Sequence, residues 1–248
     1  MIVLRSVLFN VAFYLMTALM LVFGAPGFLL FGERVATNHV RLWGRIGVFL
    51  LRTLAGTACE IRGRENIPTG AAIVASKHQS AFETFALLPL LPFPTFVMKQ
   101  ELTRLPLFGL YTRTTGMIHV DRSGGAQALR ALMARTREEI AKNRQIIIFP
   151  EGTRRPPGAT PDYQTGIALL YKAAGVPVVP LALNSGCYWP RRRFLHYPGT
   201  IVLEFLPPIL PGLDSKAFLA RLETTIEGAS DRLLEEAKKA GRFVRESD

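Results

Sequence analysis

Cysteine is scarce in this sequence, which has only Cys59 and Cys187 among its 248 residues. Neither lies in a C-x-x-C motif or close to a histidine, so the sequence indicates a reducing compartment and offers no disulfide framework. The Asp, Glu and His residues also lack a recognisable metal-ligand spacing, and we expect no metal site. No G-x-S-x-G motif is present, which removes the usual signature of a serine nucleophile.

Acidic residues are outnumbered, with 19 Asp and Glu against 30 Lys and Arg, and the formal net charge is +11. This balance favours an anionic partner, namely nucleic acid, a phosphorylated substrate or acidic lipid. Zinc-finger and RNA-binding aromatic motifs are missing, so we expect no nucleic-acid partner. Polar linkers, repeats and low-complexity tracts are missing too, which indicates one large domain with an N-terminal appendage.

Charged residues are absent from residues 6 to 23, a stretch close to the ~20 residues that span a bilayer. We expect a helix there, a break at residues 24 to 27 around Pro26, and a basic amphipathic helix from residue 37 to 54. Two arrangements fit this pattern: a helical hairpin lying in one leaflet, or one span followed by a surface helix. We favour a membrane-associated hairpin over residues 1 to 57.

A cleaved signal peptide is the competing interpretation of this N-terminal stretch. The apolar core is longer than the usual 7–15 residues of a signal peptide, and no clear A-x-A cleavage site follows it. Arginines at positions 34, 41 and 45 also oppose export. We therefore expect an anionic membrane as a partner and the cytoplasmic face of the cell inner membrane as the location.

The body, residues 58 to 248, alternates strands with helices and predicts a layered α/β fold with a mostly parallel central sheet flanked by helices. We expect strands at residues 71 to 75, 95 to 99, 116 to 122, 145 to 149, 178 to 183 and 201 to 206. Helices are expected at residues 126 to 143 and 163 to 174, and from Asp214 or Ser215 toward Ala240 with a kink near Gly228.

His78 and Glu83 form the most informative pair of side chains in the sequence. In a continuous α-helix, positions five residues apart point about 140° apart, so the two meet only where the chain bends. Ser80 and Glu83 match the S-x-x-E capping box, which places Ser80 at a helix N-cap and His78 in the loop before it. The alternative is that Glu83 merely closes the capping box.

The segments around this pair resemble the 1-acylglycerol-3-phosphate acyltransferases, within the wider glycerolipid acyltransferase group. The matching blocks cover roughly residues 70 to 185 and stand in the family's order. They are Lys77-His78-Gln79-Ser80-Ala81-Phe82-Glu83, the region of Lys99, Gly116 to Arg122, Phe149-Pro150-Glu151-Gly152-Thr153-Arg154, and Val176-Pro177-Val178-Val179-Pro180-Leu181. A lone H-x4-D/E motif is weak, whereas the F-P-E-G-T-R block after an isoleucine strand is highly specific.

The resemblance implies transfer of a fatty acyl group, from acyl-CoA or acyl carrier protein, to the sn-2 hydroxyl of lysophosphatidic acid, giving phosphatidic acid. No cofactor is implied. His78 is the expected general base, because a neutral imidazole near pKa 6.5 is suited to take the hydroxyl proton. Glu83 is expected to fix the tautomer of His78 and to stabilise the imidazolium. A covalent acyl-enzyme is not required.

Recognition of the acceptor phosphate is expected at the ends of three strands. Arginine offers phosphate a fork of donors, and lysine offers a point charge. Glu151 is expected to accept a hydrogen bond from an arginine or from the backbone and so to shape the loop. The residues assigned to this site are Lys99, Arg122, Glu151, Gly152, Thr153 and Arg154.

The chain departs from the family pattern at two places. Glu83 stands where the family has an aspartate, and Tyr163-Gln164-Thr165-Gly166 stands where it has a lysine. The acceptor therefore remains open among lysophosphatidic acid, another lysolipid such as lyso-ornithine lipid, and glycerol-3-phosphate. A non-catalytic membrane adaptor that binds phospholipid is the alternative from a different class. Arg191-Arg192-Arg193 fits contact with lipid headgroups, contact with an acidic carrier protein, or a solvated loop.

Overall fold

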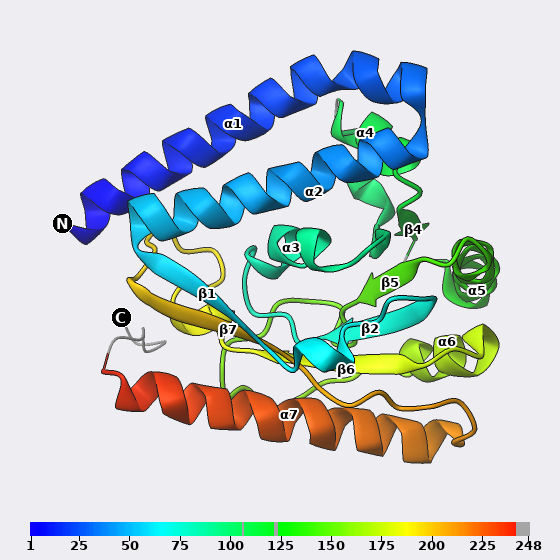
Figure 1. Ribbon diagram of the computed structural model, residues 1–248. Helices are drawn as coiled ribbons and strands as arrows, with labels where there is room; N and C mark the ends of the chain where they lie inside the picture. The colour runs from blue at the N-terminus through cyan, green and yellow to red at the C-terminus, as the bar shows by residue number, and fades with distance from the viewer. Residues whose placement is uncertain (106, 122–123, 242–248) are drawn as a thin grey trace.

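The structure, a computed structural model, describes residues 1 to 105, 107 to 121 and 124 to 241. In these residues one seven-stranded sheet runs through the centre of the molecule, in the strand order β1-β7-β6-β2-β5-β3-β4 (Figure 1). The strands are β1 Thr57–Arg62, β2 Ala72–Ser76, β3 Pro94–Lys99, β4 Ile118–Val120, β5 Gln145–Ile148, β6 Val178–Leu183 and β7 Gly199–Phe205.

Five neighbouring strands, β6, β2, β5, β3 and β4, run parallel to one another. Strand β7 runs antiparallel to β6 and parallel to β1. The predicted α/β fold with a mostly parallel sheet is therefore confirmed. Because the five strands share a direction, their carboxyl ends meet at one edge of the sheet, where ligands of such folds usually bind.

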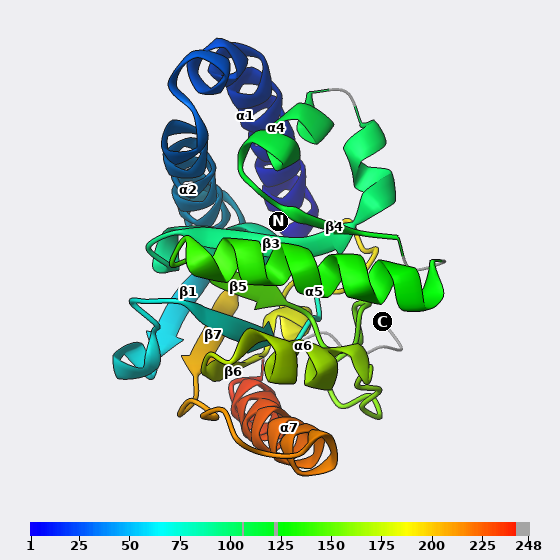
Figure 2. The same ribbon diagram turned by 90° about the vertical axis from the view of Figure 1, so that its right-hand side faces the viewer.

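Helices cover both faces of the sheet. The hairpin α1–α2 and the short helix α3 lie on one face, and α7 lies on the opposite face (Figure 1). In the view turned by 90°, α5 and α6 lie beside the strands, between the level of the hairpin and that of α7 (Figure 2). The helices are α1 Ile2–Phe31, α2 Glu33–Leu50, α3 Glu83–Ala86, α4 Phe108–Thr114, α5 Gly125–Ala141, α6 Gly166–Ala174 and α7 Ser215–Lys239.

Alternate side chains of β2 pack into different cores on the two faces of the sheet. Val74 packs into the core under α3, with Phe82 and Phe85, whereas Ile73 and Ala75 pack into the core formed with α5, α6 and α7. Successive residues of a strand point to opposite faces. Continued past the end of β2, this alternation turns residue 78 toward the α3 side and residue 77 toward α7.

The hairpin turns later than the sequence predicted. Helix α1 continues through Pro26, and the chain reverses at Gly32, whose φ of 78° suits glycine. One and a half turns before Pro26, the Met20 carbonyl accepts hydrogen bonds from Tyr111 Oη at 2.6 Å and from His39 Nε2 at 3.1 Å. These contacts come from outside α1 and hold the helix near residue 20. The predicted break rested on the local Pro and Gly residues alone.

Polar contacts join the two arms of the hairpin at its open end and fix the hairpin to the body at its closed end. At its open end, Arg5 Nε donates to the Leu54 carbonyl at 2.9 Å, within the π-helical turn η1 (Leu51–Ala55). At its closed end, the fully buried Arg144 pairs with Glu33 of α2 and with Glu139 of α5. Between these points Gly44 packs so tightly that a Cβ atom there would lie 2.4 Å from the Phe85 carbonyl oxygen.

Other boundaries also differ from the expected ones. Strand β1 was not predicted, because it is an edge strand whose residues are mostly half-exposed and carry no long β-branched run. Helix α6 begins at Gly166 rather than at residue 163. Helix α7 is continuous through Gly228, where the expected kink stays a prediction. Asp214 caps α7 as expected, since its carboxylate accepts from the backbone N–H groups of Lys216 and Ala217. The division of the chain at residue 57 stays a prediction.

Candidate active site

His78 and Glu83 are in direct contact, as the bend between them requires. His78 Nδ1 lies 2.9 Å from Glu83 Oε1, across the loop that joins β2 to α3. The carboxylate of Glu83 is fully buried, and 12% of the His78 side chain is exposed. The pair therefore stands at the carboxyl end of a central parallel strand, with the imidazole nearer to solvent than the acid.

The carboxylate of Glu83 is held by a dense set of donors. Its Oε1 accepts from the backbone N–H groups of Gln79 at 2.6 Å and Ser80 at 2.7 Å. Its Oε2 accepts from Ser80 Oγ at 3.2 Å and from Ser185 Oγ at 2.8 Å. One half of the predicted capping box is thus present, but Ser80 Oγ accepts from Phe82 N and the helix begins only at Glu83.

These donors keep the Glu83 carboxylate ionised and select the tautomer of His78. Burial by itself would raise the pKa of Glu83, but the His78 contact and the Ser80 and Ser185 donors outweigh it and lower that pKa. An ionised carboxylate can only accept, so His78 Nδ1 must carry the proton and donate it to Glu83. The hydrogen-bond network therefore leaves the lone pair of the neutral imidazole on Nε2.

The plane of the imidazole is set by an aromatic contact. The rings of His78 and Phe149 are stacked, with centroids 3.8 Å apart and an interplanar angle of 13°. Phe149 follows β5 and is itself stacked on Phe96 of β3, at 5.9 Å. The histidine is thereby held on one side by Glu83 and on one face by Phe149, a contact that the sequence did not predict although Phe149 opens the F-P-E-G-T-R block.

The loop after Phe149 is folded against the histidine. The N–H of Gly152 donates to the Phe149 carbonyl at 2.9 Å and closes a tight turn, in which Gly152 has φ 64°. Two residues past Thr153, the N–H of Arg155 donates to the His78 carbonyl at 2.8 Å. The E-G-T-R loop and the His78 loop thus form one unit, joined through the backbone.

A buried ionic cluster lies on the other side of the sheet, under this loop. Lys77 Nζ lies 3.1 Å from Glu151 Oε1 and 2.8 Å from both carboxylate oxygens of Glu227 on α7. Tyr163 Oη donates to Glu227 at 2.7 Å. Burial raises the pKa of Glu151, and the charge of Lys77 opposes this rise. A lysine thus reaches the region of Tyr163 from β2, although the block around Tyr163 has none.

The cluster changes the interpretation of Glu151. We expected an arginine or a backbone N–H as its donor; the structure places Lys77 there, and Arg155 Nε follows at 3.9 Å. Its carboxylate is buried against Lys77, a position from which Glu151 can shape the loop, and its assignment to the phosphate site stays a prediction. Lys77 and Glu227 were not among the predicted site residues.

The predicted phosphate-binding cations lie at different distances from the histidine. Arg154 is half-buried and adjoins Arg155, which is bonded to His78. Thr153 is exposed on the same loop. Lys99 ends β3 with an exposed side chain, at the same edge of the sheet but one strand beyond β5. Arg122 lies outside the described residues.

Two further residues of the site were missed because they act over long separations in sequence. Ser185, just past β6, donates to Glu83, which is 102 positions away. Gln79 Oε1 accepts from the backbone N–H of Gly186 at 3.0 Å. The available signal was the parallel arrangement of β2 and β6, since residues that directly follow adjacent parallel strands meet at one edge.

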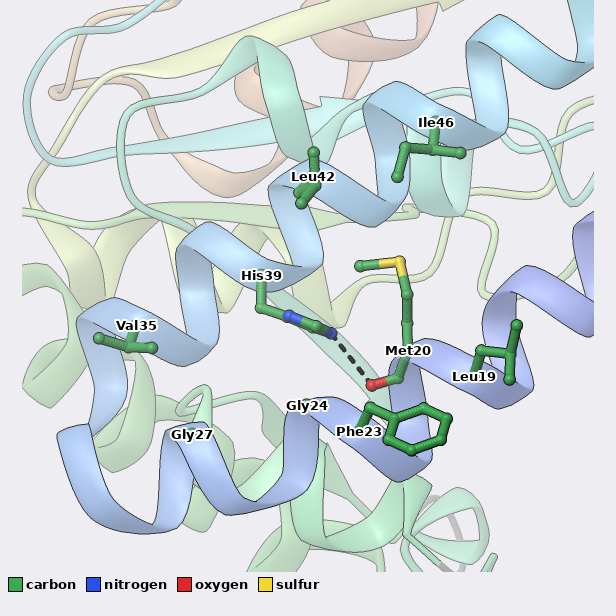
Figure 3. A pocket seen from close by; sticks show the side chains of 9 residues that line it. All are labelled: Leu19, Met20, Phe23, Gly24, Gly27, Val35, His39, Leu42 and Ile46. Carbon is green, nitrogen blue, oxygen red and sulfur yellow. Dashed lines mark hydrogen bonds between the residues drawn. The ribbon is translucent and has the colours of Figure 1, made fainter.

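An apolar hollow of about 500 Å³ lies in the hairpin, away from the His78 pair. In Figure 3 the imidazole of His39 points at the Met20 carbonyl across this hollow. It is lined by Leu19, Met20, Phe23, Gly24, Gly27, Val35, His39, Leu42 and Ile46. Since its one titratable side chain already contacts Met20, we assign no reacting group to it.

Comparisons with known proteins identify the family of this chain. A family model described as acyltransferase matches residues 58–184. A protein of Pseudomonas aeruginosa named 1-acyl-sn-glycerol-3-phosphate acyltransferase is 40% identical over 168 residues, which cover 68% of this chain and 65% of that protein. A protein of Limnanthes alba with the same name is 33% identical over 170 residues, 68% of this chain and 60% of its own. The chain thus spans less than two thirds of the length of these curated relatives.

One solved structure shares the fold over nearly the whole chain. It is the crystal structure of the 1-acyl-sn-glycerophosphate (LPA) acyltransferase from Thermotoga maritima, with a TM-score of 0.78 and 24% sequence identity. The match covers 94% of this chain and 98% of that one. The likeness therefore includes the α1–α2 hairpin as well as the sheet.

Proposed function

The chain belongs to the acyltransferase family, and from this premise we propose that it transfers a fatty acyl group to the sn-2 hydroxyl of lysophosphatidic acid, giving phosphatidic acid. The names of the relatives from Pseudomonas aeruginosa and Limnanthes alba support this acceptor. The single observation that carries the proposal is the contact of 2.9 Å between His78 Nδ1 and Glu83 Oε1, which leaves Nε2 as a base.

The first step is attack of the acceptor hydroxyl on the thioester carbonyl of the acyl donor. His78 Nε2 takes the hydroxyl proton as the new C–O bond forms, so that no free alkoxide is needed. The imidazolium that results is stabilised by the ionised Glu83, whose charge is already held by four other hydrogen bonds. The C–O bond and the protonated base therefore arise in one step.

The second step is collapse of the tetrahedral intermediate. The C–S bond breaks, the acyl group remains on the acceptor oxygen, and the departing sulfur receives the proton from His78 Nε2. Atoms and charge balance, and His78 returns to its neutral form. The donor is a thioester of coenzyme A or of acyl carrier protein, and no residue of the enzyme becomes acylated.

The acceptor phosphate is assigned to the basic groups beside the histidine. Arg154 is the first of these, because the neighbouring Arg155 is bonded to the His78 carbonyl and so fixes the distance between loop and base. Lys99 adds charge from the end of β3, and Arg122 is assigned by its motif alone. We further propose that the enzyme works at the cytoplasmic face of the cell inner membrane, attached through the apolar segment Ile2–Gly27 of α1.

The test is acyl transfer by the purified full chain in detergent micelles. Labelled acyl-CoA and acyl carrier protein are each offered with lysophosphatidic acid, glycerol-3-phosphate, lysophosphatidylcholine and lyso-ornithine lipid. We expect label in phosphatidic acid, released by a phospholipase that cleaves at the sn-2 position. If only another acceptor is labelled, that acceptor replaces lysophosphatidic acid in the proposal. Absence of transfer to all four acceptors would overturn the proposal.

Substitution of the base separates an enzyme from a lipid-binding adaptor. His78→Ala is expected to abolish turnover and to leave both the melting temperature and the binding of lysophosphatidic acid close to those of the unaltered chain. His78→Gln serves as a second variant that preserves side-chain volume. Turnover at the original rate in both variants would refute the role of His78 as the base.

A further inference from the structure

A turn of three arginines stands out on the surface of the protein. Residues 190 to 194, called here the arginine turn, follow the short helix η5 (Ser185–Cys187) and are closed by a hydrogen bond of 3.3 Å from Arg193 N to the Pro190 carbonyl. Arg191, Arg192 and Arg193 are all exposed, and 54% of Phe194 is exposed. Three arginines and one phenylalanine in succession are therefore exposed.

The arginine turn is fixed to the first helix. Asn10 Nδ2 donates to the Phe194 carbonyl at 3.2 Å, and the N–H of His196 donates to Ser6 Oγ at 2.9 Å. The ring of Phe9 packs against His196, with centroids 4.6 Å apart. The turn consequently has one position relative to α1 and is held beside the first three turns of that helix.

The neighbouring face of α1 is apolar and exposed. Of the side chains one turn away from Ser6 and Asn10, Val3 is 60% exposed and Tyr14 is 67% exposed. The other large apolar side chains exposed on the first half of α1 are Ile2, Leu4, Val7, Leu8, Val11 and Leu15. An apolar helix face bordered by guanidinium groups and an aromatic ring is the composition of a segment that lies at a membrane interface.

The arginine turn also contacts the loop that we assign to the acceptor phosphate. Arg191 Nη1 donates to the Arg154 carbonyl at 2.9 Å. The turn thus joins α1 on one side to the E-G-T-R loop on the other. A surface that binds headgroups at this place would present the bilayer next to the reacting histidine.

We propose that the arginine turn, together with the exposed face of α1, is a docking surface for a bilayer that contains anionic phospholipids. The guanidinium groups of Arg192 and Arg193 take headgroup phosphates, and Phe194 enters the boundary between headgroups and acyl chains. The occupant is a lipid surface and not an acidic protein, because the cations border an apolar helix face. This inference extends the membrane attachment proposed above and does not depend on acyl transfer.

The experiment measures binding of the full chain to vesicles, without acyl donor or acceptor. Vesicles of phosphatidylcholine alone are compared with vesicles containing about 30% phosphatidylglycerol, by co-sedimentation. The variant is Arg191→Gln/Arg192→Gln/Arg193→Gln. We expect its preference for anionic vesicles to fall roughly 100-fold, because each basic side chain at an anionic surface contributes about a factor of five. Binding equal to that of the unaltered chain would overturn the proposal.

A matched control removes the same charge from the far side of the sheet. Lys216, Arg221 and Lys239 are exposed on α7, opposite the hairpin (Figure 1). Lys216→Gln/Arg221→Gln/Lys239→Gln is expected to keep most of the preference for anionic vesicles. An equal loss in this control would show that only the net charge matters, and would overturn the assignment to the arginine turn.

A second variant and a second ligand complete the test. Arg192→Gln/Arg193→Gln retains the contact between Arg191 and the Arg154 carbonyl. We expect its preference for anionic vesicles to fall roughly 25-fold, with an unchanged melting temperature. Binding of an acidic acyl carrier protein is measured in the absence of lipid. Loss of carrier binding with vesicle binding intact would assign the arginine turn to the carrier and overturn its assignment to the membrane.

Discussion

The imidazole of His78 lies parallel to the phenyl ring of Phe149, with the ring centroids 3.8 Å apart. One face of the proposed base is therefore covered, and rotation of the ring about its bond to Cβ is blocked on that side. Glu83 fixes the direction of Nδ1, and Phe149 fixes the plane in which the ring lies. Together they determine where Nε2 points.

Removal of the stacking ring should slow the reaction without weakening acceptor binding. We expect Phe149→Leu to lower kcat about tenfold and to leave KM for the acceptor unchanged, since an aromatic contact contributes ~0.5–1.5 kcal/mol and tenfold in rate is about 1.4 kcal/mol. Phe149→Tyr keeps the ring face and is the control. Equal losses of kcat in both variants would contradict the role of the stacked ring.

The charge of Glu83 should matter more than its length. We expect Glu83→Gln to lower kcat about 10³-fold, because an amide cannot stabilise the imidazolium and leaves the Ser185 hydroxyl a poorer partner. Glu83→Asp keeps the charge and should retain at least about tenfold more activity than Glu83→Gln. The measurement is kcat at neutral pH, with the melting temperature as a check on folding. Equal kcat values for the two variants would reduce Glu83 to a helix cap.

The ionic cluster around Lys77 should behave as a coupled unit. Lys77→Met leaves Glu151 and Glu227 without their shared cation, and we expect it to lower the free energy of unfolding by about 3–5 kcal/mol. The double variant Lys77→Met/Glu227→Gln should be less destabilised than the sum of the two single variants. Lys238→Met is the control, because its ion pair with Glu235 is exposed and contributes no more than about 1 kcal/mol. Strict additivity in urea unfolding would argue against coupling.

The buried His196 should make the fold sensitive to mild acid. Burial lowers the pKa of His196 from its ordinary 6.5 to about 4. Since the unfolded chain takes up this proton first, stability from His196 is complete above about pH 6.5 and is lost as pH falls toward 4, by up to about 3 kcal/mol. His196→Phe keeps a ring against Phe9 and Trp189 but does not titrate.

The measurement for His196 is urea unfolding in detergent, followed by tryptophan fluorescence at about pH 7, 5.5 and 4.5. We expect the stability of His196→Phe relative to the unaltered chain to rise steadily over this range as the pH falls. If the difference in unfolding free energy between the two chains is the same at all three pH values, protonation of His196 does not contribute to the pH dependence of stability.

Local sequence patterns were sufficient for much of the fold. The segment Gln145–Ile148, with its three isoleucines, is β5, and the other predicted strand segments of the body overlap β2, β3, β4, β6 and β7. The contact between His78 and Glu83 followed from their spacing and from Ser80, because a helix would have separated them. Such features depend on residues that are close together in sequence, and a single chain carries that information.

Features that depend on distant contacts were not predictable in the same way. The hairpin turn lies at Gly32 and not near Pro26, and the helix before Pro26 is bonded to distant residues, since Tyr111 and His39 contact the Met20 carbonyl. The donor to Glu151 is Lys77, whose direction depends on how β2 alternates against α7. Each of these outcomes is decided by packing between elements that no short motif records.

The ion pair between Arg144 and Glu33 has a mechanical consequence. Near the open end, the N–H of His196 donates to Ser6 Oγ, so both ends of the hairpin are bonded to the body, which opposes a swinging motion over the sheet. The distance between His78 and the surface that α1 contacts is then fixed in the folded chain. If His78 is the base and α1 lies on a membrane, as proposed, the acceptor hydroxyl has to reach that fixed distance from the membrane surface.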